Sequence, residues 1–308
     1  MKKGQSTDGM MPFLSVVIAS VSGSPSIVEC LGALMNQAGQ ISCEILVIDR
    51  CGEPTREEIR RRIPRPEVKV ISIEGKPSIP RLRAIGIGKV KGRLVAILED
   101  HCIVPPTWFE TIARAYAAGH QVIGGPVENG AIDRIVDWAV YFCEYSRFMA
   151  PLPRGRTPEI AGNCAIYCRD VLERLGDKLQ EEVWEGFLHQ KLKEMGIEFY
   201  CDPDLVVCHK KEFGFGYFMS QRYHYSRSFA SMRMKGVFWP GRLAYAFATP
   251  LLPPLLFARM VSSIWRKKRH LTKFALAAPF ILSFLISWAF GEAVGALFGP
   301  GRSLERVD

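Results

Sequence analysis

The strongest constraint on the fold is an alternation of short apolar runs with helix-like segments in the first third of this 308-residue chain. The runs are rich in Val, Ile and Leu and occupy residues 14–19, 43–48, 68–73 and 94–98. Their length and β-branched composition are typical of buried strands. Strands that alternate with helices predict an α/β fold, with a mostly parallel sheet flanked by helices.

Polar side chains directly follow two of these runs. Asp49 comes after the second run, and Glu99, Asp100 and His101 come after the fourth. In open parallel sheets, ligands bind outside the carboxyl ends of the strands, so these residues are candidates for one site. No G-x-G-x-x-G or Walker-type loop follows the first run, which argues against the usual dinucleotide and P-loop sites.

The last third of the chain is apolar and basic at once. From Phe213 to Gly291 there are eleven Lys or Arg and no Asp or Glu, so the rest of the chain has a net charge of −2 out of a total of +9. A segment that is both basic and apolar favours an anionic membrane surface over nucleic acid as its partner.

Two apolar stretches lie in this region. Residues 243–264 contain three prolines, whereas 274–298 is long enough for a span of ~20 residues. The basic cluster 266–269 lies between them, and positively charged loops tend to stay in the cytosol. We therefore predict an interfacial or re-entrant segment at 243–264 and a transmembrane helix at 274–298. A two-span hairpin and two buried helices of a soluble protein are the alternatives.

The cysteines and the N-terminus favour a catalytic part that faces the cytoplasm from the inner or cytoplasmic membrane. The nine cysteines are scattered without a C-x-x-C pair, which is typical of reduced, mostly buried thiols. Lys2 and Lys3 are followed by polar residues and not by the apolar region of a signal peptide. The expected organisation is a tail at 1–12, a catalytic domain at 13–235 and a membrane-associating region at 236–308.

Four motifs, in this order and at ordinary spacing, resemble the family 2 glycosyltransferases, which have the GT-A fold. They are Leu14-Ser15-Val16-Val17-Ile18, Glu44-Ile45-Leu46-Val47-Ile48-Asp49, Arg81-Leu82-Arg83-Ala84-Ile85-Gly86 and Val95-Ala96-Ile97-Leu98-Glu99-Asp100-His101. The resemblance covers about residues 14–231. It implies a transferase that uses a nucleotide-sugar donor, with C-terminal membrane helices added to the GT-A domain.

The resemblance also assigns donor contacts. Asp49 matches the acid that contacts the base, usually uracil, and Arg83 is expected near the diphosphate; Ala19 and Ser20, at the end of the first strand, are further candidate contacts. A capping role for Asp49 and a surface-exposed Arg83 are the alternatives. Arg222 is a candidate diphosphate ligand within an element that resembles Q-x-x-R-W, unless it belongs to a basic interfacial helix. That element lacks the Arg-Trp pair, which argues against a processive polysaccharide synthase.

The family's metal motif, D-x-D, reads Glu99-Asp100-His101 in this chain. A cation at this strand end would neutralise the charge of the departing diphosphate. Carboxylates suit Mn²⁺ or Mg²⁺, and an imidazole shifts the preference toward Mn²⁺. We expect Glu99 and His101 to bind the metal and Asp100 to contribute to donor binding. His209, after a later strand, is a candidate third ligand, although it could equally be a packed histidine.

Inverting transfer needs a general base for the acceptor hydroxyl. The family places an acid at the start of a helix, and Glu185 occupies the matching position, with Trp184 in place of the preceding acid. The positive end of a helix favours a negative charge there. Glu181 and Glu182 are rivals, and all three glutamates could be ordinary first-turn acids.

Together these residues predict an inverting, metal-dependent glycosyltransferase at a membrane. The expected reaction moves a sugar from a nucleotide sugar, most simply a UDP-sugar, to a hydroxyl of a lipid or lipid-linked acceptor. Because Glu99, His101 and Trp184 depart from the family pattern, a catalytically inactive nucleotide-sugar-binding membrane scaffold is an alternative. A related nucleotidyltransferase is another, but its usual Gly-rich start is missing.

Overall fold

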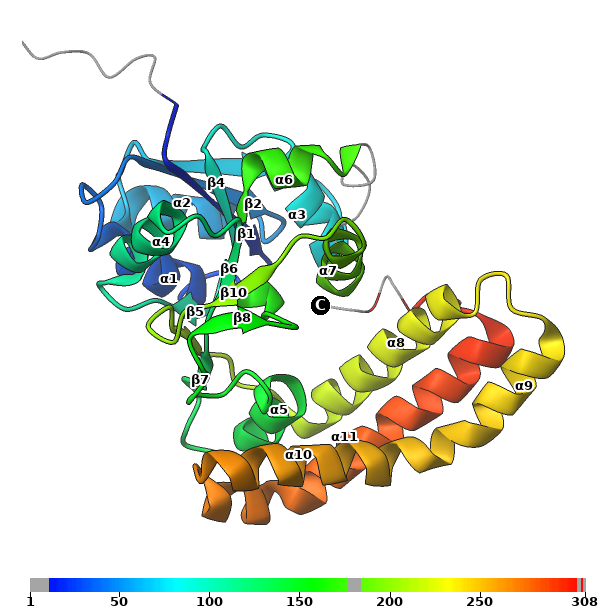
Figure 1. Cartoon of the computed structure of the whole chain (residues 1–308). Helices are drawn as coiled ribbons and strands as arrows, with labels where there is room; N and C mark the ends of the chain where they lie inside the picture. The colour runs from blue at the N-terminus through cyan, green and yellow to red at the C-terminus, as the bar shows by residue number, and fades with distance from the viewer. Residues whose placement is uncertain (1–10, 177–183, 304–305, 307–308) are drawn as a thin grey trace, which may run out of the picture. The chain divides into compact units, whose positions relative to one another are not determined.

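The computed structural model describes residues 11–176, 184–303 and 306. The chain divides into two compact units (Figure 1). The first consists of Met1–Gly75, Pro80–Gly125 and Pro153–Val206, and the second of Lys76–Ile79, Pro126–Leu152 and Val207–Asp308. This division cuts through residues 13–235, so the boundaries predicted for the catalytic domain stay a prediction.

The first unit is built around an eight-stranded sheet in the order β3-β2-β1-β4-β9-β6-β10-β8. Its strands are β1 (Leu14–Ser20), β2 (Cys43–Asp49), β3 (Val68–Ser72), β4 (Leu94–Glu99), β6 (Val122–Gly124), β8 (Gly155–Thr157), β9 (Ala165–Cys168) and β10 (Phe199–Cys201). The neighbours β3–β2, β2–β1, β1–β4 and β6–β10 are parallel, while β9 and β8 run antiparallel to their partners. The predicted α/β fold with a mostly parallel sheet is confirmed.

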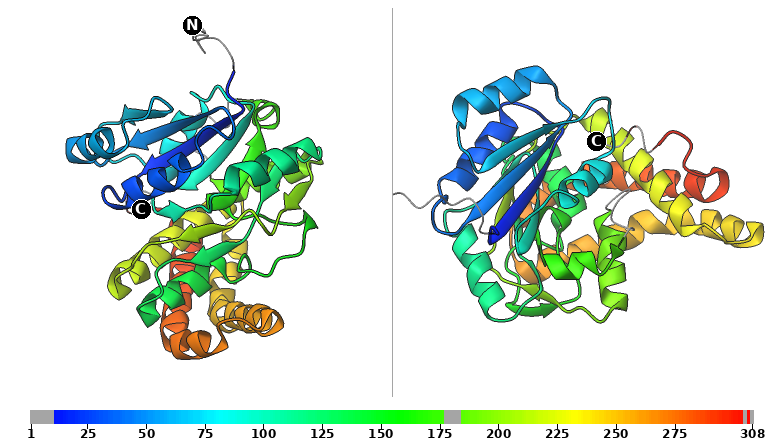
Figure 2. Two further views of the ribbon diagram at one scale, coloured as in Figure 1. Left: turned by 90° about the vertical axis from the view of Figure 1, so that its left-hand side faces the viewer. Right: turned by 90° about the horizontal axis from the view of Figure 1, so that it is seen from above.

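Helices flank this sheet. They are α1 (Ser26–Met35), α2 (Glu53–Arg62), α3 (Ile79–Ile87), α4 (Trp108–Ala117), α6 (Arg169–Glu173) and α7 (Glu185–Glu194), and the short strand β5 (Cys102–Ile103) follows β4. Helices α1 and α2 lie on one side of strands β1 and β2, and α3 lies on the other (Figure 2). All seven residues of β1 are buried, as expected for an apolar strand that is covered on both faces.

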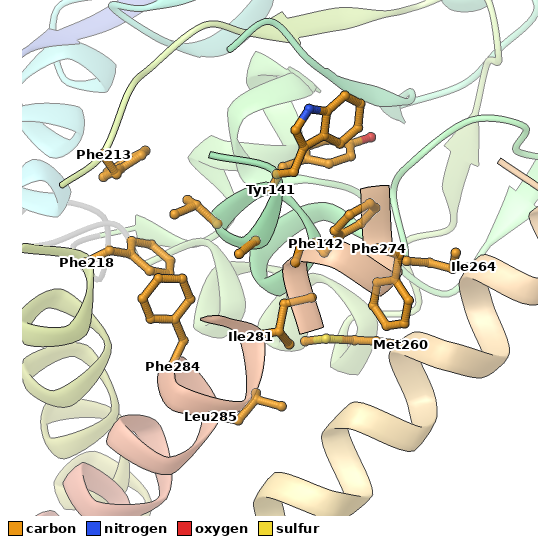
Figure 3. Packing of buried hydrophobic residues seen from close by; sticks show 14 of the residues in the cluster. Tyr141, Phe142, Phe213, Phe218, Met260, Ile264, Phe274, Ile281, Phe284 and Leu285 are labelled. Carbon is orange, nitrogen blue, oxygen red and sulfur yellow. The ribbon is translucent and has the colours of Figure 1, made fainter. Parts of the chain in front are cut away.

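The second unit is mostly helical. It contains α5 (Ile135–Tyr145), α8 (Phe215–Arg233), α9 (Trp239–Ala248), α10 (Leu252–Lys267) and α11 (Leu271–Phe298), with a parallel pair of short strands, β7 (Val127–Asn129) and β11 (Val207–His209). Helix α11 packs against the other four helices. In the core shown in Figure 3, the rings of Phe142 and Phe274 meet edge to face at 5.2 Å, and those of Phe218 and Phe284 at 4.7 Å.

The apolar C-terminal segments form two long helices. Helix α9, a 3₁₀ turn at Thr249–Leu251 and α10 together make one helical stretch, Trp239–Lys267. The prolines do not end it because each lies in the first turn of its own segment, where a backbone N–H has no partner to lose. Both this stretch and α11 are long and apolar enough to cross a membrane.

Two glycines one turn apart, Gly291 and Gly295, allow α11 to approach α8 closely. A Cβ atom at Gly291 would collide with the hydroxyl of Ser226 and the carbonyl oxygen of Tyr223. At Gly295 it would collide with the carbonyl oxygen of Arg227. Backbone atoms cannot move aside as a flexible side chain can, so these helices need small residues at both positions.

We therefore expect Gly291→Ala to destabilise the second unit. Overpacking of a tight contact costs about 1–3 kcal/mol, which would lower the thermal unfolding temperature of the full chain. Gly216→Ala in α8 is the matched control because a Cβ there meets nothing within 4 Å, and alanine favours the helix. An unfolding temperature of Gly291→Ala equal to that of the control would show that this contact is not tight.

Candidate active site

The register of the strands brings the predicted strand-end residues of the first unit to one edge of its sheet. Strand β1 lies between β2 and β4, with Ser20 opposite Asp49 and Ala19 opposite Glu99. Residues that lie far apart in the sequence therefore become neighbours. This edge is where a parallel sheet offers a ligand site.

Glu99 and His101 have suitable atoms for a metal ion at this edge. The Oε2 atom of Glu99 lies 3.3 Å from Nε2 of His101, and each side chain is of a type that can ligate an ion. The other ring nitrogen of His101, Nδ1, lies 2.9 Å from Oδ1 of Asp100. When Nδ1–H donates its hydrogen bond to this carboxylate, Nε2 is the ring nitrogen that can ligate an ion, so this donor set fits Mn²⁺ or Mg²⁺.

Asp100 orients its neighbours and is itself fully buried. Its Oδ2 atom accepts hydrogen bonds from the backbone N–H groups of Val21 and Ser22, at 2.7 and 2.6 Å. Burial raises the pKa of such a carboxyl, but the hydrogen bonds and the charge of His101 outweigh it and hold the pKa of Asp100 below its usual value. Asp100 thus ties His101 to the loop after β1, and its direct contact with the donor stays a prediction.

The carboxylates of Asp100 and Glu99 shift the pKa of His101. Burial lowers the pKa of its imidazole, while the hydrogen bonds and charges of Asp100 and Glu99 raise it and prevail, so the pKa of His101 lies above its usual value. A ligating imidazole must be neutral at the ligand atom. Metal binding here therefore competes with a proton on the ring.

Arg83 lies between Glu99, a predicted metal ligand, and Glu185, the predicted base. It lies on α3, is 5% exposed, and forms ion pairs with Glu99 (Nη2 to Oε1, 3.3 Å) and with Glu185. The alternative of an exposed Arg83 is therefore wrong. A buried guanidinium between two carboxylates balances their charges and places both next to one cation.

Glu185 is the first residue of α7, after the N-cap residue Trp184. Its side chain passes so close to Gly162 that a Cβ there would lie 2.5 Å from Cγ of Glu185. Only glycine leaves room for the glutamate at this point. The rival bases Glu181 and Glu182 lie outside the described residues.

Asp49 is fully buried, and both of its oxygens have partners. Oδ1 accepts hydrogen bonds from the Ser20 hydroxyl (2.9 Å) and the Cys51 N–H (3.2 Å). Oδ2 accepts from the Gly52 N–H (3.3 Å) and from Arg56 (3.2 Å). Asp49 thus organises the turn after β2, and its contact with a base stays a prediction. Arg56 could not be predicted from the sequence, because this pair forms only when α2 folds back on β2.

Two further candidates belong to the second unit. His209 ends β11 and is 5% exposed, with ring centroids of Tyr145 at 5.0 Å and Phe213 at 6.4 Å. Arg222 lies on α8 with its guanidinium carbon 4.0 Å from the ring centroid of Trp288. Their roles as metal ligand and diphosphate contact stay predictions.

Comparisons with known proteins agree with this architecture. The family model described as glycosyl transferase family 2 matches residues 15–176. The succinoglycan biosynthesis protein ExoO of Rhizobium meliloti is 29% identical over 113 residues, which are 36% of this chain and 32% of that protein. The glycosyltransferase AglE of Haloferax volcanii is 26% identical over 122 residues, which are 38% of this chain and 40% of that protein. These matches span well under half of each relative.

A solved structure resembles nearly the whole chain. It is the mannosyltransferase PcManGT from Pyrobaculum calidifontis in complex with GDP-Man and Mn²⁺, with a TM-score of 0.56 and 16% identity. The likeness covers 92% of this chain and 88% of that one. It shows that the fold is GT-A.

Proposed function

The chain belongs to glycosyltransferase family 2, and we propose that it transfers a sugar, with inversion, from a nucleotide-sugar donor to a hydroxyl of a lipid or lipid-linked acceptor. The observation that carries this proposal is the cluster of Glu99, His101, Arg83 and Glu185 at one edge of the first unit's sheet. It combines a metal-ligating pair, a cation and a carboxylate base, which are the groups that such a transfer requires.

We propose Mn²⁺ or Mg²⁺ as the cofactor, with Mn²⁺ preferred because one ligand is an imidazole. When bound, the ion would neutralise negative charge on the departing nucleoside diphosphate. The complex of PcManGT with GDP-Man and Mn²⁺ supports a nucleotide sugar and a divalent ion for this chain. A UDP-sugar is proposed from the position of Asp49. His209 is proposed as a third ligand on its residue type and its place at a strand end.

The chain's own residues support a single displacement. Glu185 takes the proton of the acceptor hydroxyl while that oxygen bonds to the anomeric carbon and the bond from this carbon to the phosphate oxygen breaks. The electron pair of the broken bond leaves with the nucleoside diphosphate. Arg83, already next to Glu185 and Glu99, is placed to interact with the negative charge that develops on this leaving group.

The apolar helices of the second unit are the basis for the proposed acceptor and membrane location. These two helices favour the inner or cytoplasmic membrane, with the catalytic residues on the cytoplasmic side. An acceptor that is a lipid, or is linked to one, would reach an enzyme held at that surface. Arg222, on α8 of the same unit, is the proposed diphosphate contact.

A thermal-shift screen of the full chain tests the donor and the metal. We expect UDP- or GDP-sugars to raise the unfolding temperature when Mn²⁺ is present and much less without it. A ligand at 100 times its Kd stabilises by about 2.7 kcal/mol. The proposal would be contradicted if no nucleotide sugar raised the unfolding temperature. Donor turnover in the presence of acceptor lipids then separates an enzyme from a scaffold that binds without reacting.

A further inference from the structure

We propose that the second unit attaches in the plane of the membrane interface, through the outer face of the Trp239–Lys267 helical stretch, and that α11 is a packed helix of this unit and not a span. This deepens the proposed membrane location and rests on it. The occupant of the face is an anionic lipid surface. The proposal follows from an exposed apolar stripe, the charges beside it and the polar partners of α11.

The outer face of the helical stretch carries large apolar side chains about one turn apart. Phe247 is 77% exposed, Leu251 68% and Trp265 69%. The stripe consists of Trp239, Leu243, Phe247, Leu251, Leu255 and Trp265. Exposed apolar patches of this extent on a soluble surface mark sites that bind a membrane or a partner, and tryptophans near both ends are typical of the lipid–water interface.

The charges favour anionic lipid over a protein partner. Arg259 and Arg266 are exposed on the same helical stretch, and Lys268 is exposed directly after it. No acidic residue occurs from Phe213 to Gly291 to oppose them. Lys and Arg side chains near an anionic membrane surface are attracted to it.

Helix α11 runs beside α8, which is too polar for the hydrocarbon. Ser287 donates a hydrogen bond to the carbonyl oxygen of Met219 (2.7 Å), and Arg222 lies over the ring of Trp288 at 4.0 Å. Further along, Arg233 pairs with Glu292, which is 2% exposed. If α11 crossed the bilayer with α8 beside it, Arg222 would enter the hydrocarbon, where charged side chains are costly and rare.

In the other half of α11, one face is buried in the core of the unit. Phe274 packs edge to face against Phe142 of α5, and Ala277 and Ile281 are fully buried in the same core (Figure 3). One face of α11 is therefore in contact with the unit's own helices along its length, while Leu276, Ile286 and Phe290 are 56%, 60% and 63% exposed. The packed face accounts for part of the apolar character of α11.

The turn between α10 and α11 is fixed to α5 and β7. Lys267 donates hydrogen bonds to the carbonyl oxygens of Ser146 (3.1 Å) and Arg147 (2.8 Å), which follow α5. Arg269 forms an ion pair with Glu128 of β7 at 2.6 Å. A spanning hairpin would keep this end near α5 and would carry the α8–α9 connection, residues 234–238, to the far side of the bilayer.

Thiol labelling of the full chain separates the two arrangements. The protein is bound to sealed vesicles that contain phosphatidylserine, and a membrane-impermeant maleimide is added outside. The added cysteine in Lys235→Cys should react without detergent, as should that in Lys268→Cys. Both native residues are exposed, whereas all nine native cysteines are buried or half-buried, so the new thiol reacts first. The in-plane arrangement would be overturned if the cysteine in Lys235→Cys reacted only after detergent is added while that in Lys268→Cys reacted without it.

A charge on the stripe tests the face itself. We expect Leu251→Glu to weaken co-sedimentation with phosphatidylserine vesicles at least tenfold. Met195→Glu is the matched control, because Met195 is 40% exposed and lies after α7 of the first unit. Equal vesicle binding by both variants, or tighter binding of the unaltered chain to neutral vesicles, would overturn the proposal. Nucleotide binding is measured without vesicles, so failure here is distinct from failure of the proposed enzymatic function.

Discussion

Asp100→Asn is expected to lower the affinity of the chain for Mn²⁺ by about 10- to 100-fold, the usual effect of losing a partner that orients a metal ligand. Asparagine can still accept a hydrogen bond from the N–H groups of Val21 and Ser22 through its amide oxygen. Its NH₂ group then faces Nδ1 of His101, which must become the acceptor. The ring proton moves to Nε2, the atom that should bind the metal.

The affinity is measured by titrating the chain with Mn²⁺ and monitoring the free ion by electron paramagnetic resonance. Turnover should fall as well and should recover in part when Mn²⁺ is raised. Asp202→Asn is the matched control, since Asp202 is 1% exposed and pairs with Arg154 at 2.5 Å. It should lower stability but leave Mn²⁺ affinity unchanged. Unaltered Mn²⁺ affinity in Asp100→Asn would show that Asp100 does not set the orientation of His101.

The strands of the sheet could be predicted from the sequence because the signal for each strand is local. Each strand is a compact apolar run, and parallel packing places the ends of neighbouring strands at one edge. This is why Asp49 and Glu99, fifty positions apart in the chain, could be assigned to one edge in advance. The structure adds the register, with Ser20 opposite Asp49 and Ala19 opposite Glu99.

The partners of these residues could not be predicted in the same way. The ion pair between Arg83 and Glu185 joins α3 to α7, and the sequence of neither helix indicates that it contacts the other. Arg56 and Asp49 meet because α2 returns over the end of β2. Such contacts depend on how helices pack, which is decided by side chains far apart in the sequence.

The C-terminal helices show a different limit. Length and hydropathy make α11 a candidate span, and the transmembrane helix at 274–298 stays a prediction, but composition does not reveal what a helix packs against. Gly291 and Gly295 could have pointed to a close helix partner, since small residues four apart are typical of tight helix packing. The partner itself, α8, became visible only in the structure.

Glu185→Gln is expected to reduce kcat by about 10²- to 10⁴-fold, the range that general-base catalysis contributes. Glutamine keeps the size of the side chain and an oxygen that can accept a hydrogen bond from Arg83, but it cannot take a proton from the acceptor. Binding of Mn²⁺ and of the nucleotide sugar should therefore change little. The loss would appear in kcat, which distinguishes a base from a residue that only holds the fold.

The control for this variant is Glu194→Gln, at the other end of α7, where the carboxylate pairs with Lys191 at 2.6 Å on the surface. It should retain full turnover. If Glu185→Gln also retained turnover, Glu185 would not be the base, and the same substitution at Glu181 and Glu182 would then find which glutamate is. Because Gln at 185 preserves the contacts of a buried arginine, loss of kcat with intact donor binding would locate proton transfer at this side chain.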